Sequence, residues 1–462
     1  MTRTIFAALL LTSAAFPAAA QDAPAEPKAK NVILFIGDGM GISTITAARI
    51  YEAQKRGETG EENQLSFEKF DNVALVKTYN TNAQVPDSAG TATAMHSGLK
   101  TRIGVLGIGP DAEKGVCKDA LAHPLPLLGE EVKQRGLALG IVTTTRLTHA
   151  TPASVYSRSA DRDWESDTNI PADQQGQGCK DIALQLAEAT FDVALGGGTA
   201  MFYGKGMGGR RGDAAADLPA QWASLSGGVV VTDTAELRAA PMDTPVLGLF
   251  NPSHMTFMAD RQPDSAEPTL TDMTAQAIAR LSTDPDGFYL MVEGGRIDHA
   301  HHGGQAGYAL EEAVEFARAV QWAVDHTDPA ETLILVTADH SHVFTIAGYP
   351  QRGNDILGLV VPPVGRGEDA GDGSPALALD GKPYTTLGYA NGPGALRGER
   401  PAPATGINAI QQATVPTGGE THAGEDVALF ATGPGADRAR GVIEQNVIYS
   451  IIRKALGWES KE

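Results

Sequence analysis

The densest group of reactive side chains in the sequence lies between Glu293 and His302, where two carboxylates and three imidazoles occur within ten residues. Such a group is costly to bury unless a positive charge lies among its members. Asp298 and His302 are four residues apart, so a helical turn would place both on one face. Because carboxylates and imidazoles together are typical zinc ligands, this segment predicts a metal site.

Residues of the same types recur beside other apolar runs of the chain. Continuous apolar runs of this length are typical of strands that are buried on both faces of a parallel sheet. Taken singly, each motif fits an ordinary surface turn equally well. Ligands of open α/β sheets bind at the carboxyl ends of strands, so the recurrence favours one shared site. The candidates are Asp38 after residues 31–36, Glu293 after 287–292, Asp339 and His340 after 332–337, and His422 ahead of 426–431.

Ser88 precedes a run of small residues, 89–94, that predicts a tightly packed helix. A serine at a helix N-terminus lies in a field that favours its alkoxide and any phosphate that it carries. Ordinary N-capping by Asp87 or Ser88 would produce the same pattern. The serine is therefore a candidate nucleophile only in combination with the metal site.

Residues 143–152 end a predicted strand in hydroxyl groups and include His149 and Thr151. Two arginines follow, Arg158 and Arg162, and a planar guanidinium group can bind two phosphoryl oxygens at once. The segment thus offers oxygen ligands for a metal together with a phosphate clamp.

Strands alternate with helices along most of the chain, which predicts an α/β fold with a large, mostly parallel central sheet flanked by helices. Residues 345–420 differ, because they are rich in Gly, Pro and Ala and separate two predicted strands. We expect a signal peptide at 1–20, a flexible leader at 21–30, a catalytic α/β domain at 31–344 and 421–462, and a small loop-rich insertion at 345–420. The predicted strands are 31–36, 137–143, 191–195, 287–292, 332–337 and 426–431, and the clearest helices are 42–56 and 308–324.

The first twenty residues have the pattern of a secretory signal, with Arg3, an apolar stretch at 6–16 and alanines at 18–20. Its removal takes away one positive charge and changes the net charge from −20 to −21, which disfavours a nucleic-acid-binding role. The remaining chain contains no segment typical of a membrane or lipid anchor. We therefore expect a periplasmic or secreted protein, in which the two cysteines, Cys117 and Cys179, would form a disulfide.

Taken together, these segments resemble the alkaline phosphatase family, in the form closer to animal enzymes than to the commonest enterobacterial one. The resemblance runs from about residue 31 to 447 and is carried by five blocks in the same order. These are Asn-Val-Ile-Leu-Phe-Ile-Gly-Asp38-Gly-Met-Gly, Pro-Asp87-Ser88-Ala-Gly-Thr-Ala-Thr-Ala, Glu293-Gly-Gly-Arg-Ile-Asp298-His299, Thr-Ala-Asp339-His340-Ser-His and Thr-His422-Ala-Gly-Glu-Asp.

The resemblance implies hydrolysis of small phosphate monoesters through a phosphorylated Ser88, with two zinc ions and one magnesium ion per subunit. Arg162, rather than Arg158, would clamp the phosphate, with Asp87 orienting it and His299 close by. The implied metal ligands are Asp298, His302 and His422 for one zinc, Asp339 and His340 for the second, Asp38 as a bridge to magnesium, and Glu293 and Thr151 for magnesium, with His149 beside that ion. Cys117 and Cys179 also match a disulfide of the animal-type members.

Some features of the sequence depart from the pattern of the animal-type members. The leader at 21–30 is too short and polar for their N-terminal helix, and segment 251–258 has a methionine where they carry an acidic calcium ligand, so a calcium site is doubtful. The insertion at 345–420 resembles their crown subdomain at the dimer interface, which implies a homodimer. His301 receives no role.

Three alternatives carry different sequence signatures. Sulfatases with a related metal frame would need a Cys/Ser-x-Pro-x-Arg context, whereas Ser88 is followed by Ala-Gly-Thr-Ala. Related diesterases usually use threonine and lack the arginine clamp. A catalytically silent zinc-binding protein would hold metal without turning over a phosphate ester.

Overall fold

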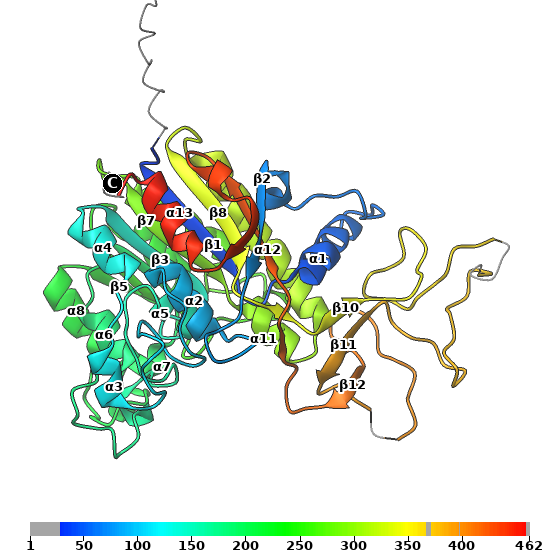
Figure 1. The fold of residues 1–462 in the computed structure, drawn as a ribbon, viewed down its shortest axis with the longest axis horizontal. Coiled ribbons are helices and arrows are strands. Elements are labelled where there is room, and N and C mark those ends of the chain that lie inside the picture. Colours follow the sequence, from blue (N-terminus) through cyan, green and yellow to red (C-terminus); the bar gives the residue numbers. More distant parts are fainter. Residues whose placement is uncertain (1–27, 366–370, 397, 459–462) are drawn as a thin grey trace, which may run out of the picture.

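A computed structural model of the chain describes residues 28–365, 371–396 and 398–458. The expected signal peptide lies outside these residues, as does all but the last part of the expected leader. A ten-stranded sheet forms the centre of the described structure (Figure 1). Its strands are β1 (Asn31–Gly37), β2 (Asn72–Lys77), β3 (Ala138–Arg146), β4 (Val193–Gly197), β5 (Val229–Val231), β6 (Val246–Leu249), β7 (Phe288–Gly294), β8 (Thr332–Ala338), β14 (Val427–Thr432) and β15 (Gly441–Glu444).

The strands lie in the order β15-β2-β14-β8-β1-β7-β3-β4-β6-β5. β14 runs antiparallel to both of its neighbours, and the other pairings in the sheet are parallel. The side chains of β7 and β8 are buried along their whole length, as expected for central strands covered on both faces. The predicted α/β class and mostly parallel sheet are confirmed.

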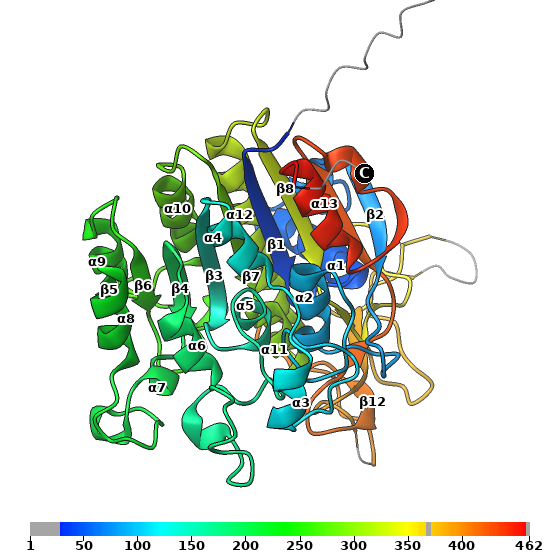
Figure 2. The same ribbon diagram turned by 60° about the vertical axis from the view of Figure 1, so that its left-hand side comes forward.

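Helices cover both faces of the sheet (Figures 1 and 2). α2, α4, α5 and α13 pack together on one face, and α1, α10 and α12 pack on the other. Phe35 of β1 meets Phe316 of α12 edge-on at 5.8 Å, which anchors the second layer. The helices are α1 (Ile42–Gln54), α2 (Ser88–Ser97), α3 (Cys117–Ala122), α4 (Leu128–Gln134), α5 (Ala150–Ala153), α6 (Ile182–Glu188), α7 (Thr199–Phe202), α8 (Leu218–Ser226), α9 (Thr234–Ala239), α10 (Leu270–Leu281), α11 (Arg296–His302), α12 (Ala306–His326) and α13 (Val447–Ala455).

The six predicted strands are present, with shifted boundaries. β3 continues to Arg146, three residues beyond the predicted end, and β7 includes Glu293, which the sequence places just after a strand. The two predicted helices also form, as α1 and a longer α12. Four strands of the sheet, β2, β5, β6 and β15, are absent from the prediction because they are short or carry exposed side chains on the outer part of the sheet.

The described residues of the 345–420 segment stand apart from the central sheet (Figure 1). Together with Phe344 they form a second, three-stranded sheet of β10 (Phe344–Ile346), β11 (Leu387–Gly392) and β12 (Ala413–Pro416). Outside this sheet, segments 357–361 and 384–387 are joined by a bridge between Leu359 and Thr385, and β11 begins at the end of the second segment. The boundaries of an inserted subdomain stay a prediction.

Cys117 and Cys179 are bonded to each other, which confirms the expected disulfide. Cys117 packs in a small separate apolar cluster with Val105, Ile108 and Trp164. The bond therefore ties the segment that contains α3 to the chain just ahead of α6. No helix in the described part of the chain combines the length and the apolar character needed to cross a membrane.

The central strands place the candidate site. β3, β7, β1 and β8 are consecutive neighbours, and their carboxyl ends lie level, because Glu293 pairs in register with Thr143 on one side and Ile36 on the other. On the other side of β1, Gly37 pairs in register with Ala338 of β8. The residues that follow these four strands therefore meet at one edge of the sheet. A short two-stranded ribbon, β9 (Ser341–His342) with β13 (His422–Ala423), lies beside them.

Candidate active site

Four carboxylates converge at the carboxyl ends of the central strands. Asp38 follows β1, Glu293 is near the end of β7, Asp339 follows β8, and Asp298 lies in α11, directly after β7. All four are buried. The sequence expectation that these residues lie together is fulfilled in the structure.

Gly39 permits this close approach. Its backbone is in the left-handed region (φ 69°), and a Cβ atom there would lie 2.2 Å from Nε2 of His342. Its N–H donates to Oδ1 of Asp339 at 3.0 Å. The turn after β1 therefore needs a glycine to bring the ends of β1 and β8 against α11.

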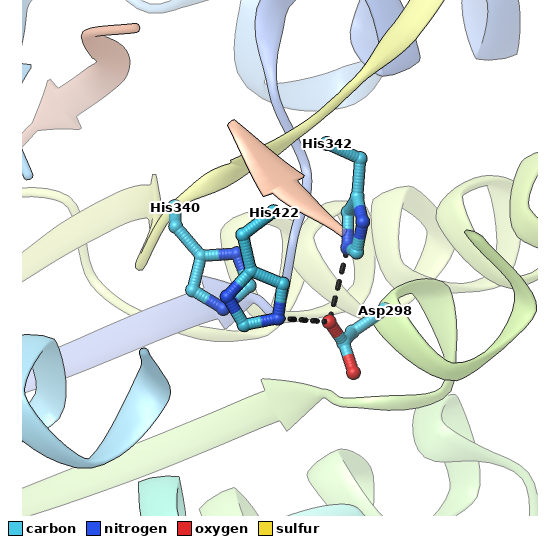
Figure 3. Close-up of side chains that lie close together, drawn as sticks. All are labelled: Asp298, His340, His342 and His422. Carbon is cyan, nitrogen blue, oxygen red and sulfur yellow. Dashed lines mark ion pairs between the residues drawn. The ribbon is translucent and has the colours of Figure 1, made fainter. Parts of the chain in front are cut away.

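Asp298 lies at the centre of a cluster of imidazoles. Its Oδ1 atom is 3.0 Å from Nε2 of His342, 3.2 Å from Nε2 of His302 and 3.3 Å from Nε2 of His422. Figure 3 shows His342 and His422 directed at this carboxylate from two sides. Burial opposes ionisation, but the contacts with the histidines hold the pKa of Asp298 well below its ordinary value. His302 and Asp298 come from one turn of α11, as their spacing predicts.

His340 connects this cluster to Ser88. The ring of His340 stacks on that of His422 with centroids 3.6 Å apart (Figure 3), and its Nε2 is 3.2 Å from Oγ of Ser88. The same nitrogen is 3.4 Å from Asp38 and 3.3 Å from Asp339. Ser88 is the first residue of α2, and the side chain of Asp87 caps that helix by accepting from Gly90 N at 3.1 Å.

Arg162 is joined to the site through Asp87, the residue before Ser88, and through His149. Its Nη1 donates to Asp87 at 3.1 Å, and its Nη2 lies 3.1 Å from Nε2 of His149. Asp87 is also held by Gly104 N at 3.0 Å. Arg158 is instead used in a two-pronged ion pair with Glu130. The structure therefore brings Arg162 and Asp87 to Ser88 and leaves Arg158 elsewhere.

Glu293 and Thr151 lie together on the α5 side of the site. Burial raises the pKa of Glu293 to about 7, although hydrogen bonds from the Thr143 and Thr145 hydroxyls oppose this shift. Glu293, Asp38 and His149 each place a ligand atom within 4.8 Å of the others. These residues form the second group of the site.

The donor set of the site fits cations. Burial and the negative charges of Asp339, Asp298 and Glu293 raise the pKa of Asp38 well above its ordinary value, so bound positive charge would relieve the site. Among the described residues, the groups of three or more possible metal ligands all lie at this edge of the sheet. Several buried oxygen atoms also have no hydrogen-bond partner within the described structure, namely both carboxylate oxygens of Asp38, Oε1 of Glu293, Oδ1 of Asp298, Oδ2 of Asp339 and Oγ1 of Thr151.

His299 faces a part of the site that the sequence did not reveal. Its ring lies 4.2 Å from that of His254 and 5.4 Å from that of His149. His254 is held by Arg146, which in turn pairs with Glu165 at 2.6 Å. Burial lowers the pKa of His299 to about 3, and nearby Arg296 acts in the same direction. His254 comes from a loop after β6, so no local spacing connects it with the site.

His342 and Glu420 were also missed as site residues. Nδ1 of His342 is 2.5 Å from a carboxylate oxygen of Glu420. The available signals were the alternation Asp339-His340-Ser341-His342 and the position of Glu420 two residues ahead of His422. Neither signal specifies that the two residues touch.

Segment 251–258 is held to its surroundings by hydrogen bonds to two glutamates. The side chain of Glu267 accepts hydrogen bonds from Asn251 at 2.6 Å and from the backbone of Thr256 at 2.9 Å, and Arg261 lies 3.6 Å away. The N–H of Met258 donates to Glu312 at 2.6 Å.

A parallel sheet whose strand ends gather carboxylates and imidazoles, beside a serine at a helix N-terminus and an arginine, defines a metal-dependent hydrolase. The arginine and the helix terminus favour a phosphate ester as substrate.

Comparison with known proteins gives the family. The model of the family described as alkaline phosphatase matches residues 29–458. The tissue-nonspecific alkaline phosphatase of Gallus gallus is 45% identical over 451 residues, covering 91% of this chain and 83% of the relative. The alkaline phosphatase of Gadus morhua is 43% identical over 446 residues, covering 91% and 90%. This chain therefore belongs to the alkaline phosphatase family and is a metal-dependent enzyme that hydrolyses phosphate monoesters.

Solved structures agree on the fold. The alkaline phosphatase of Thermus thermophilus superposes with a TM-score of 0.69 at 24% identity, covering 94% of this chain and 92% of that one. The enzyme of the Antarctic bacterium TAB5 gives a TM-score of 0.65 at 23% identity, covering 94% and 100%.

Glu312, on α12 beside the site, provides a test of buried charge in this region. Burial raises its pKa to about 7, although Met258 N–H and Arg296 oppose the shift. The pKa of a glutamate in the unfolded chain is about 4.3. Between this pH and about 7, the folded state therefore retains a proton that the unfolded state releases. The free energy of unfolding should therefore fall as pH rises through this window, by up to about 3 kcal/mol.

Glu312→Gln should remove that part of the pH dependence, because glutamine does not ionise. Urea denaturation at a series of pH values between about 4.5 and 7.5 measures the free energy of unfolding of both proteins. Parallel pH profiles for the two proteins would contradict the assignment.

Proposed function

We propose that Ser88 is the nucleophile of this phosphatase and is transiently phosphorylated. The observation that carries the proposal is the position of its Oγ atom, 3.2 Å from His340 on one side and next to the Asp87–Arg162 pair on the other. The serine is also the first residue of α2, where the free backbone N–H groups stabilise negative charge.

We propose that two zinc ions and one magnesium ion bind at the strand ends. Asp298, His302 and His422 would hold one zinc, and Asp339 and His340 the other, with Asp38 shared between the latter and magnesium. Glu293 and Thr151 would complete the magnesium site. Buried oxygens without hydrogen-bond partners among the described residues, such as those of Asp38, support this assignment. When bound, the metals supply positive charge that favours ionised oxygen nucleophiles and leaving groups.

His149 is proposed to lie beside magnesium rather than to ligate it. Arg162 donates to Nε2 of His149, so the neutral ring carries its proton on Nδ1. An N–H directed at the site can orient an oxygen but cannot act as a ligand. The buried position and the adjacent guanidinium group lower the pKa of His149 well below its ordinary value, which keeps the ring neutral.

Arg162 is proposed to bind two non-bridging oxygens of the phosphoryl group, in the geometry for which a guanidinium group is suited. Asp87 receives two hydrogen bonds from the chain and one from Arg162, so it holds the guanidinium group in place. His299, whose ring is kept neutral by its surroundings, would lie near the bound phosphate.

The reaction then proceeds in two displacements. Oγ of Ser88 attacks phosphorus, the bond to the ester oxygen breaks, and the alcohol leaves with a proton. Water next attacks the phosphorus of phosphoserine, the bond to Oγ breaks, and inorganic phosphate is released with Ser88 restored. Arg162 holds the phosphoryl oxygens through both steps, which offsets the repulsion of an anion by a protein with a net charge of −20.

Ser88→Ala should abolish the phosphorylated enzyme while leaving the metal content unchanged, because the proposed ligand groups remain complete enough to hold the ions. Acid quenching with a ³²P-labelled monoester measures the phosphoenzyme, and mass spectrometry of the metals measures occupancy. Ser88→Thr is a matched control that keeps a hydroxyl group. Full turnover by Ser88→Ala would contradict the covalent mechanism, and a sulfate ester hydrolysed in preference to the monoester would contradict the substrate class.

We propose that the protein acts outside the cytoplasm, in the periplasm or the medium. The disulfide between Cys117 and Cys179 supports this proposal, because such bonds persist in oxidising compartments. A calcium site is not proposed, because segment 251–258 has a methionine where the animal-type members carry an acidic calcium ligand.

We also propose a homodimer that uses the insertion at 345–420. This segment exposes several large apolar side chains, which a second copy would cover. Light scattering after size exclusion should give the mass of two chains, and a monomer mass at micromolar concentration would contradict the proposal. The exposed side chains are Tyr349, Val364, Leu377 and Leu379.

A further inference from the structure

Glu420 is buried beside the proposed zinc ligands but has no part in the proposed chemistry. It lies where the chain returns from the 345–420 insertion, two residues ahead of His422. One carboxylate oxygen accepts from Nδ1 of His342 at 2.5 Å, and the other accepts from the backbone N–H of Val343 at 2.7 Å. Both oxygens of this buried carboxylate are therefore used by the segment that follows β8.

The backbone of the same residue fixes His302. The Glu420 carbonyl oxygen is 2.5 Å from Nδ1 of His302, and the Glu420 N–H donates to the His302 carbonyl oxygen at 2.9 Å. With Nδ1 occupied, His302 presents Nε2 to Asp298, 3.2 Å away. Glu420 therefore orients one imidazole through its backbone and another through its side chain.

His342 is confined by residues on all sides. Its Nε2 is 3.0 Å from Asp298, and its ring packs on His301 with centroids 4.7 Å apart. His301 is itself held by Thr44 at 2.9 Å and by the hydroxyl of Tyr389, in the insertion, at 2.8 Å. His301, which had no role in the sequence, thus supports the imidazole that Glu420 orients.

We infer that Glu420 is a positioning residue that fixes His302 and His342 around Asp298 and thereby sets how tightly zinc is held there. The inference rests on the proposed assignment of Asp298, His302 and His422 to one zinc. Carboxylates that hydrogen-bond to imidazoles beside a metal fix the tautomer and the ring orientation, and their loss commonly weakens metal binding 10- to 100-fold.

Glu420→Gln is the informative substitution because it keeps the shape of the side chain. Two N–H groups now face two acceptor oxygens, and glutamine offers one acceptor and one NH₂ group. Either Val343 or His342 then loses its acceptor, or His342 shifts its proton to Nε2, where it competes for Oδ1 of Asp298. Each outcome loosens the Asp298 cluster.

The zinc-loaded enzyme is mixed with a chromogenic chelator, and the rate of zinc release is recorded for the parent and for Glu420→Gln. We expect one zinc equivalent to leave about 10- to 100-fold faster from the variant. Glu425→Gln is the matched control, since Glu425 is an exposed carboxylate of the same segment that accepts from the Ser341 hydroxyl. The control should release zinc at the parental rate.

The melting temperatures of the metal-free proteins distinguish a positioning role of Glu420 from a purely structural one. Faster zinc release with an unchanged apo melting temperature supports positioning. A lowered apo melting temperature with parental zinc release overturns it, as does parental release with no other change. The parent should hold a zinc ion that is lost in Asp298→Asn. If it does not, the metal assignment fails along with this inference. If the parent retains that zinc and Glu420→Gln does not affect it, only the inference fails.

His342→Gln provides a second route if Glu420→Gln does not fold. It should also accelerate zinc release, and the effects of the two substitutions should combine to less than their product in the double variant, because Glu420 acts in part through His342. Fully multiplicative effects of the two substitutions would contradict that coupling.

Discussion

The structure depends on the burial of four carboxylates at one edge of a parallel sheet. Asp38, Glu293, Asp298 and Asp339 are brought together because β1, β7 and β8 are adjacent, parallel and level at their carboxyl ends. Loss of solvent and mutual repulsion raise the pKa of Asp38 and Glu293, whereas contacts with histidines hold the pKa of Asp298 below its ordinary value. Positive charge placed among them allows them to remain ionised.

The surrounding elements arrange further ligand groups and the reactive serine around these carboxylates. α11 continues directly from β7 and adds an aspartate and a histidine in one turn, while the ribbon of β9 and β13 brings two more imidazoles to the same carboxylate. α2 brings Ser88 to His340, and Asp87, the residue before Ser88, holds Arg162. The insertion at 345–420 contributes at its end, since Glu420 is its last residue and His422 follows two residues later. Folding of the insertion and assembly of the site are therefore connected by the chain itself.

Much of this could be predicted from local sequence. Continuous apolar runs identify the central strands, and parallel strands place their following residues at one edge, so Asp38, Asp339 and His340 are expected to converge. The i, i+4 spacing of Asp298 and His302 is realised within α11. The order of the five motifs gives the family, which the comparisons confirm. Short outer strands such as β5 and β15 escape prediction, because three or four residues carry too little periodicity.

Contacts between distant segments could not be read from the sequence. Glu420 and His342 are 78 residues apart and meet only because the β9–β13 ribbon pairs them. His254 likewise reaches His299 from a loop after β6. Spacing along the chain encodes neighbours on a helix or strand, whereas these contacts depend on how the sheet and the insertion pack.

Anomalous X-ray scattering at the zinc absorption edge, from crystals of the purified enzyme, tests most directly whether the buried carboxylates are metal ligands. The account predicts two zinc peaks, one within about 2.0–2.2 Å of ligand atoms of Asp298, His302 and His422, and one equally close to Asp38, Asp339 and His340. The absence of zinc peaks at the ends of β1, β7 and β8 in active enzyme, or zinc found only elsewhere on the protein, would contradict it.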